Sequence, residues 1–119
     1  MHEQASWIEE LQIAITVTDR AGTIVEMNGR SRSTFASDGG GELIGRNLVD
    51  CHPPAARDKI AALIASGGAN HYTIRKGGRR KIIHQMPWFQ NGQFAGLVEI
   101  SVPIPEQLPE FDRDAPRGV

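Results

Sequence analysis

Two short segments carry the side chains best suited to chemistry, and each combines a histidine with a sulfur atom. Cys51 and His52 stand directly before Pro53-Pro54, a pair that suits the first turn of a helix. Backbone N–H groups and the dipole at a helix start stabilise a thiolate, and a protonated His52 would add to that effect. Cys51 is therefore a candidate redox-active or ligand-reactive thiol, although the commoner role of such a cysteine is a small, half-buried residue beside a helix start.

The second segment contains His84 and Met86, and it raises the question of haem. Two residues apart on one strand, these side chains point to the same face about 7 Å apart, so they cannot approach one iron from opposite sides. His52 could pair with either of them across a cavity, but the Cys-x-x-Cys-His attachment motif is absent. Zinc needs about four ligands in close spacing, which these residues and His71 do not supply. The cofactor stays open between haem, another small molecule and none, and an ordinary hydrogen-bonded role for His84 is the commoner alternative.

The composition is that of one small globular domain. The chain has 119 residues, of which 39% are hydrophobic and 23% charged. A formal net charge of -1 creates no overall field that would favour nucleic acid or an anionic membrane. One cysteine permits no internal disulfide, the polar N-terminus lacks the apolar core of a signal peptide, and no apolar run could span a bilayer. We expect a cytoplasmic protein that binds neither nucleic acid nor membrane.

The first half of the chain predicts a helix, a β-hairpin and two more helices. Gly22 is placed to take a positive φ in the hairpin turn, and Asn28 can cap the helix that follows the second strand. The expected elements are a short helix with Trp7, Ile8 and Leu11 on one stripe, strands over 13–18 and 23–27, a short helix over 28–35 and a longer helix over about 53–66.

The last third of the chain predicts three strands joined by tight turns. On the middle strand, His84, Met86 and Trp88 alternate with Gln85, so they share one face. Trp88, Met86 and Phe94 would suit the apolar walls of a pocket, with Tyr72, His84 and Gln85 supplying polar contacts, although a core without a ligand is the commoner role of such residues. The expected strands are 72–75, 82–89 and 94–102, with turns at 76–79 and at Asn91-Gly92.

This order of elements resembles a PAS domain. Three segments carry the resemblance, 17–28, 43–48 and 92–100, and it covers roughly residues 5–104. Within the family the chain is most similar to PAS modules with a Cys-His-Pro-Pro element, here residues 51–54. The resemblance implies an α+β fold, with short helices over one face of a five-stranded antiparallel sheet and an N-terminal helix. It divides the chain into a stand-alone sensor domain at 1–104 and a Pro-containing acidic tail at 105–119.

The resemblance also sets expectations about ligands and partners. PAS domains hold haem, flavin, small organic molecules or nothing, and many form dimers in which N-terminal helices pack on the outer face of the sheet. The strand over 94–102 is partly apolar on both faces, which fits a homodimer of that kind. The light-sensing branch has its reactive cysteine directly after a Gly-x-Asn, whereas Leu48 follows Gly45-Arg46-Asn47 here. We therefore do not expect a covalent flavin adduct.

The leading hypothesis is a sensory or regulatory module rather than an enzyme. It would bind a small ligand or a protein partner, such as a kinase or transcription regulator, and would signal by conformational change or dimerisation. Two alternatives stay open: a small enzyme using Asp50, His52 and His84, and an assembly module that binds no ligand. The candidate cavity-lining residues are Cys51, His52, Tyr72, His84, Met86 and Trp88.

Overall fold

The protein is built on one antiparallel sheet, seen in a computed structural model that describes residues 5–50 and 52–114. The strand order is β2-β1-β5-β4-β3, so the first and last strands of the sheet in sequence, β1 and β5, are neighbours near its middle. The predicted α+β fold with five antiparallel strands is confirmed. The strands are β1 (Ala14–Thr18), β2 (Ile24–Met27), β3 (Asn70–Lys76), β4 (Arg79–Gln90) and β5 (Gln93–Ile104).

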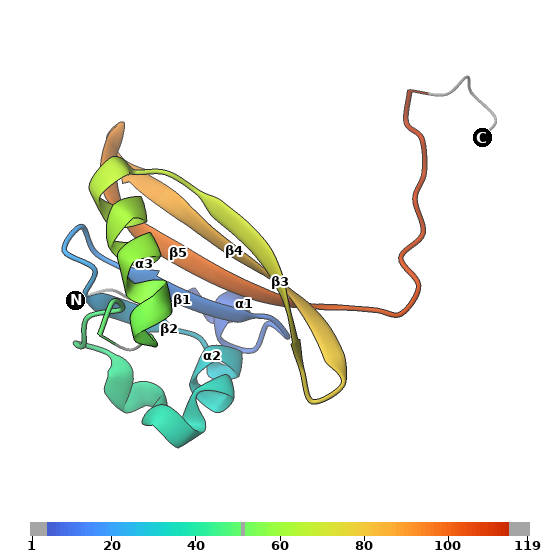
Figure 1. Ribbon diagram of the computed structural model, residues 1–119, viewed down its shortest axis with the longest axis horizontal. Coiled ribbons are helices and arrows are strands. Elements are labelled where there is room, and N and C mark those ends of the chain that lie inside the picture. The colour runs from blue at the N-terminus through green and yellow to red at the C-terminus, as the bar shows by residue number, and fades with distance from the viewer. Residues whose placement is uncertain (1–4, 51, 115–119) are drawn as a thin grey trace.

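Short helices lie over one face of this sheet, which we call the inner face, and the long helix α3 crosses that face (Figure 1). Hydrogen bonds from the side chains of Asn28 and Arg32 hold α1 beside the start of α2. Of the expected apolar stripe, Trp7 keeps 67% of its surface exposed, whereas Ile8 and Leu11 are half-buried. The helices are α1 (Ser6–Glu9), α2 (Gly29–Thr34), η1 (Ala36–Asp38), η2 (Gly40–Leu43) and α3 (Pro54–Ser66).

Local signals in the sequence define most of the element ends. Helix α3 starts after Pro53 and ends at Gly67, which has the left-handed φ of 66° that favours glycine. Asn91 and Gly92 both take positive φ in the turn between β4 and β5, as an Asn-Gly hairpin requires. These predicted boundaries are confirmed to within one or two residues.

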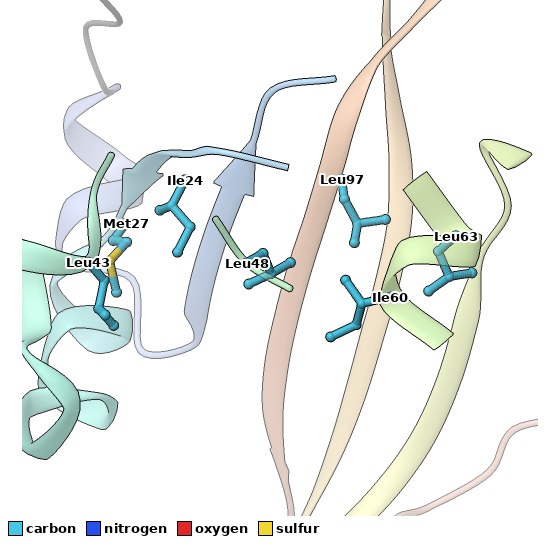
Figure 2. Packing of buried hydrophobic residues seen from close by; sticks show 7 residues of the cluster. All are labelled: Ile24, Met27, Leu43, Leu48, Ile60, Leu63 and Leu97. Carbon is cyan, nitrogen blue, oxygen red and sulfur yellow. The ribbon is translucent and has the colours of Figure 1, made fainter. Parts of the chain in front are cut away.

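The hydrophobic core lies between the inner face and the helical segments. Figure 2 shows Leu97 of β5 facing Ile60 and Leu63 of α3, while Met27 of β2 packs beside Leu43 of η2. Leu97 is fully buried, and the spacing of three between Ile60 and Leu63 keeps both on one face of the helix. The complete cluster is Ile24, Met27, Leu43, Leu48, Ile60, Leu63 and Leu97.

Gly96 allows the Trp88 side chain of β4 to cross β5 and reach β1. The Trp88 indole of β4 donates a hydrogen bond of 2.9 Å to the Thr18 carbonyl oxygen of β1, two strands away. Gly96 lies opposite Trp88, and a Cβ atom there would overlap that carbonyl. Since Gly96 also has a φ of 153°, only glycine fits without strain.

Beyond β5, residues 105–114 continue without helix or strand and leave the sheet as an extended segment (Figure 1). Within residues 5–50 and 52–114, no helix is both long and apolar enough to cross a membrane.

Asn28 joins three elements through one buried amide group. Its Oδ1 accepts hydrogen bonds from the backbone N–H groups of Ser31 and Ile15, so it caps α2 and holds the start of β1. Its Nδ2 donates to the carbonyl oxygens of Ile8 and Ile13. The capping role expected for Asn28 is confirmed, and the two donated bonds add an attachment for the N-terminal segment.

We predict that Asn28→Ala lowers the free energy of unfolding by about 3 kcal/mol, because four hydrogen bonds to a buried side chain are lost. Urea denaturation measures this change. Asn28→Asp retains the two accepted bonds and loses the two donated ones, so it separates capping from attachment of the N-terminal segment. Ser33→Ala, on the exposed side of α2, is the control and leaves stability unchanged. An Asn28→Ala variant as stable as Ser33→Ala would contradict the assignment.

Candidate functional site

A cavity of about 490 Å³ lies between the inner face of the sheet and the segments that precede α3. This volume falls in the range of sites for small organic ligands. Most of its wall is apolar, and the polar side chains lie mainly on the sheet and on the segment that leads into α3. The lining residues are Thr16, Ile24, Met27, Phe35, Asp38, Leu43, Leu48, His52, Pro53 and Glu99.

A row of polar side chains crosses the inner face from β1 to β3, and two of its members, Thr16 and Glu99, line this cavity. Thr16, Glu99, Gln85 and Asn70 lie directly opposite one another on successive strands. Asn70 donates to Gln85 Oε1 at 3.1 Å, and Gln85 Nε2 donates to Glu99 Oε2 at 2.8 Å. At the other end, the hydroxyl oxygen of Thr16 lies 2.6 Å from that of Ser31. Asn70 therefore orients the Gln85 amide, and that amide donates to the carboxylate of Glu99.

The Glu99 carboxylate is almost buried and faces a histidine. The His52 side chain is 19% exposed and that of Glu99 is 10% exposed, and Nε2 of the ring lies 3.7 Å from Oε2 of the carboxylate. The other ring nitrogen, Nδ1, lies 2.9 Å from the Leu48 carbonyl oxygen. Because a carbonyl oxygen only accepts, Nδ1 carries a proton, and a second proton on Nε2 would face Glu99. The site therefore favours a doubly protonated His52 paired with an ionised Glu99.

The titration of His52 reflects this arrangement. Interaction with the Glu99 carboxylate raises the pKa of His52 above its ordinary value, burial opposes the rise, and the Leu48 carbonyl adds to it. Tyr72, on β3, lies near the same carboxylate. Burial first, and then the charge of Glu99, raise the pKa of the Tyr72 hydroxyl. Glu99 thus raises the pKa values of two groups, His52 and Tyr72.

The structure separates the six residues predicted to line the cavity. His52 lines it, whereas Tyr72 lies on the same face of the sheet at 39% exposure and does not reach the wall. His84, Met86 and Trp88 lie on the opposite, outer face, because Ile83 and Gln85 of β4 are the buried residues. The predicted side of β4 was therefore wrong. Cys51 lies outside the described residues, so the Cys-His-Pro-Pro element is described only from His52 onward.

The position of His84 and Met86 on the outer face argues against two alternatives, a haem site and an enzyme site that includes His84. A haem held between His52 and His84 or Met86 would need ligands that face one another, but the sheet separates them. The three candidate catalytic residues, Asp50, His52 and His84, do not meet at one site either. Asp50 is exposed and lines a different pocket.

Several site residues escaped sequence reasoning, and Glu99 is the most important. Its neighbours Val98 and Ile100 are apolar, so the strand over 94–102 was considered for its apolar residues and Glu99 was overlooked. The sequence did contain a signal, a single carboxylate in the middle of an apolar strand, which indicates either a solvated face or a functional group. Gln85 is likewise a polar residue within a mostly apolar strand, and it is only 2% exposed.

We predict that wild-type His52 titrates above 6.5 and that Glu99→Gln lowers its pKa, since the neutral amide no longer favours the imidazolium. Proton NMR of the imidazole C–H signals measures both values. A raised pKa in the folded state stabilises the protein fully below the unfolded-state pKa, and this stabilisation is lost as pH rises through the folded-state pKa. The difference in free energy of unfolding between wild type and His52→Gln should therefore be largest below pH 6.5 and should shrink as the pH rises. Glu106→Gln, on an exposed residue, is the matched control, and an equal drop in the His52 pKa there would contradict the pairing.

Comparisons with known proteins agree with this architecture. Three solved structures share the fold. The sensory box sensor histidine kinase from Vibrio cholerae is 14% identical, with a TM-score of 0.60 over 84% of this chain and 87% of that chain. The Aer2 receptor from Vibrio cholerae, described as a dual PAS-haem oxygen sensor, is 17% identical, with a TM-score of 0.56 over 78% and 95%. The Vibrio cholerae VqmA dimer, described as a LuxR-type receptor, is 16% identical, with a TM-score of 0.62 over 85% and 50%.

The sequence comparisons give a family but no near relative. A search of curated protein sequences finds no match to this chain. The family described as the PAS fold matches residues 8–108, which include all five strands, α2 and α3. The chain belongs to the PAS family.

Proposed function

We propose that this PAS domain is a sensory module that binds a small ligand in the cavity and signals its occupancy through the sheet. The single observation that carries the proposal is the His52–Glu99 pair, nearly buried in the wall of a cavity of about 490 Å³. Burying two charges is costly, and a purely structural core is often equally stable with apolar residues. A ligand-binding role gives these charges a purpose, since they orient one polar group of the ligand.

The cavity favours a ligand with an apolar body and a polar edge. Met27, Leu43 and Leu48 offer apolar contacts, while Glu99 and His52 offer an acceptor and a donor on one side. Because the two charges balance one another, a neutral ligand carrying both a donor and an acceptor fits better than an ion. Haem and flavin are compatible with the family, and the absorption spectrum of the purified protein distinguishes them from a colourless ligand.

The site connects to two parts of the structure that could move. His52 lies two residues before the start of α3, so a ligand that separates His52 from Glu99 would act on that helix. Glu99 lies on β5 between Val98 and Ile100, whose side chains occupy the outer face. A ligand that bound one arrangement better than the other would shift the population between them.

The outer face supports a homodimer as the receiver of this signal. It presents half-buried apolar side chains from three adjacent strands. A contiguous apolar surface is typical of an interaction site. The V. cholerae relative described as a dimer supports self-association, and the histidine kinase relative supports a kinase as the alternative partner. The residues are Ile15, Val17, Ile82, Met86, Val98, Ile100 and Val102.

We predict that the protein retains a small molecule when purified without refolding, visible as excess mass in native mass spectrometry. Leu43→Trp fills the cavity and removes this mass, whereas Ile44→Trp makes a similar change at the adjacent exposed position and leaves it. Where no ligand survives purification, a thermal-shift screen of small molecules on the same three proteins replaces the mass. Equal ligand retention or thermal shifts in both variants, or no binding to wild type in either assay, would overturn the proposal.

We also predict a dimer of the 13.0 kDa chain by light scattering coupled to gel filtration. Met86→Glu places a charge in the apolar outer face and produces monomers with an unchanged circular dichroism spectrum. Gln90→Glu, at the exposed end of the same strand, is the control and remains dimeric. If the dimer dissociates with a constant of about 1 μM, wild type at about 100 μM is almost entirely dimeric. A monomer at that concentration would contradict self-association and favour a separate protein partner.

A further inference from the structure

Two histidines form a close pair on the outer face of the sheet, on the opposite side from the cavity. His71 of β3 and His84 of β4 are directly opposite each other in the antiparallel ladder. Their Nδ1 atoms are 2.8 Å apart, and the rings meet edge to face with centroids separated by 5.0 Å at an interplanar angle of 69°. The regular pairing of β3 with β4 holds both Cα atoms in place, so the rings are brought together by the sheet itself.

The distance between the two nitrogens suits a metal ion bound by two adjacent ligands, provided that both rings turn from their present hydrogen bond so that the Nδ1 lone pairs point to one ion. With metal–nitrogen bonds of about 2.0–2.1 Å, a nitrogen separation of 2.8 Å corresponds to a ligand–metal–ligand angle of about 86°. That angle is close to the 90° between neighbouring positions of a square-planar or octahedral ion. A tetrahedral zinc ion would need the nitrogens about 3.3 Å apart.

We propose that His71 and His84 bind a divalent transition metal ion, Cu²⁺ most tightly and Ni²⁺ next, at two neighbouring coordination positions. Imidazole nitrogen suits both ions, and Cu²⁺ binds such donors more tightly than Ni²⁺. At present one Nδ1 must donate to the other. In the metal-bound form both rings carry their proton on Nε2. The ring that now donates must therefore transfer its proton from Nδ1 to Nε2 through water, and no net proton is released.

The remaining coordination positions are open to water or to a second chain. In the described ranges, 5–50 and 52–114, no third histidine, cysteine or carboxylate joins the pair to make a larger metal-binding group. His71 is exposed, so an ion has direct access from solvent. His84 lies in the same cross-strand row as Ile100, inside the apolar outer face proposed for self-association. A metal held by this pair would therefore lie beside that interface, where a second copy could supply further ligands.

The test uses Cu²⁺ alone as the probe, by isothermal titration calorimetry and electron paramagnetic resonance. His2→Ala and Cys51→Ser are combined in the background of every protein, which removes the amino-terminal histidine and the thiol as competing ligands. The background protein is expected to bind one ion per chain, or one per two chains, with a spectrum showing imidazole nitrogen ligands. His71→Ala and His84→Ala should each abolish this binding.

Two further variants separate a specific pair from general affinity for copper. His71→Ala combined with Arg75→His keeps a histidine on the same strand and face, four residues away from the pairing position, and should not restore binding. Thr73→Ala, on the same face without a histidine change, should bind as the background does. The proposal fails if the background protein does not bind Cu²⁺, if either single histidine variant still binds it, or if the relocated histidine restores binding.

Discussion

The interaction on which the site depends is the contact of one nearly buried carboxylate, Glu99, with a hydrogen-bond donor and a histidine. Gln85 donates to it along the sheet, and His52 faces it from the segment that leads into α3. A buried carboxylate is stable only when hydrogen-bonded and paired with a positive charge, and these two partners meet both needs. The same requirement explains why Thr16, Gln85 and Asn70 form a polar row across an otherwise apolar inner face. Loss of either partner would leave the Glu99 charge poorly compensated in a nearly buried position. Because His52 lies in the segment that leads into α3, the stability of the site is linked to the position of that helix start.

The two faces of the sheet have different properties for a common geometric reason. Along β4 and β5 successive side chains alternate, so each residue of the inner face is next to a residue of the outer face. Glu99 is flanked by Val98 and Ile100, and Gln85 by His84 and Met86. The inner face thus holds the polar row and the cavity, while the outer face holds a half-buried apolar surface and a histidine pair. Any ligand that moves β5 or β4 acts on both surfaces at once, which suits a module that transmits occupancy.

Much of the fold follows from short-range chemistry. Asn91-Gly92 and Gly77-Gly78 determine where β-strands turn, Pro53-Pro54 and Gly67 mark the ends of α3, and Asn28 starts α2. The site was predicted far less well. His52 was identified as a lining residue, but His84, Met86 and Trp88 were assigned to the wrong side, and Glu99 was overlooked. Hydrophobicity favoured the Met86 and Trp88 side as the interior, although Gln85 and Glu99 are the buried residues.

The sequence by itself determined the order of the elements, their turns and caps, and the alternation of side chains along each strand, because these depend on neighbours a few residues away. Which face of the sheet receives the helices was decided only by the tertiary structure. It depends on contacts such as Leu97 with Ile60, whose partners lie far apart in the chain. The pairing of His52 with Glu99 is of the same kind, because it joins the segment before α3 to β5. By contrast, the pairs His71–His84 and Gln85–Glu99 lie across the hairpins β3-β4 and β4-β5, whose registers follow from their turns. Local preference contains no information about which face of the sheet a distant helix covers.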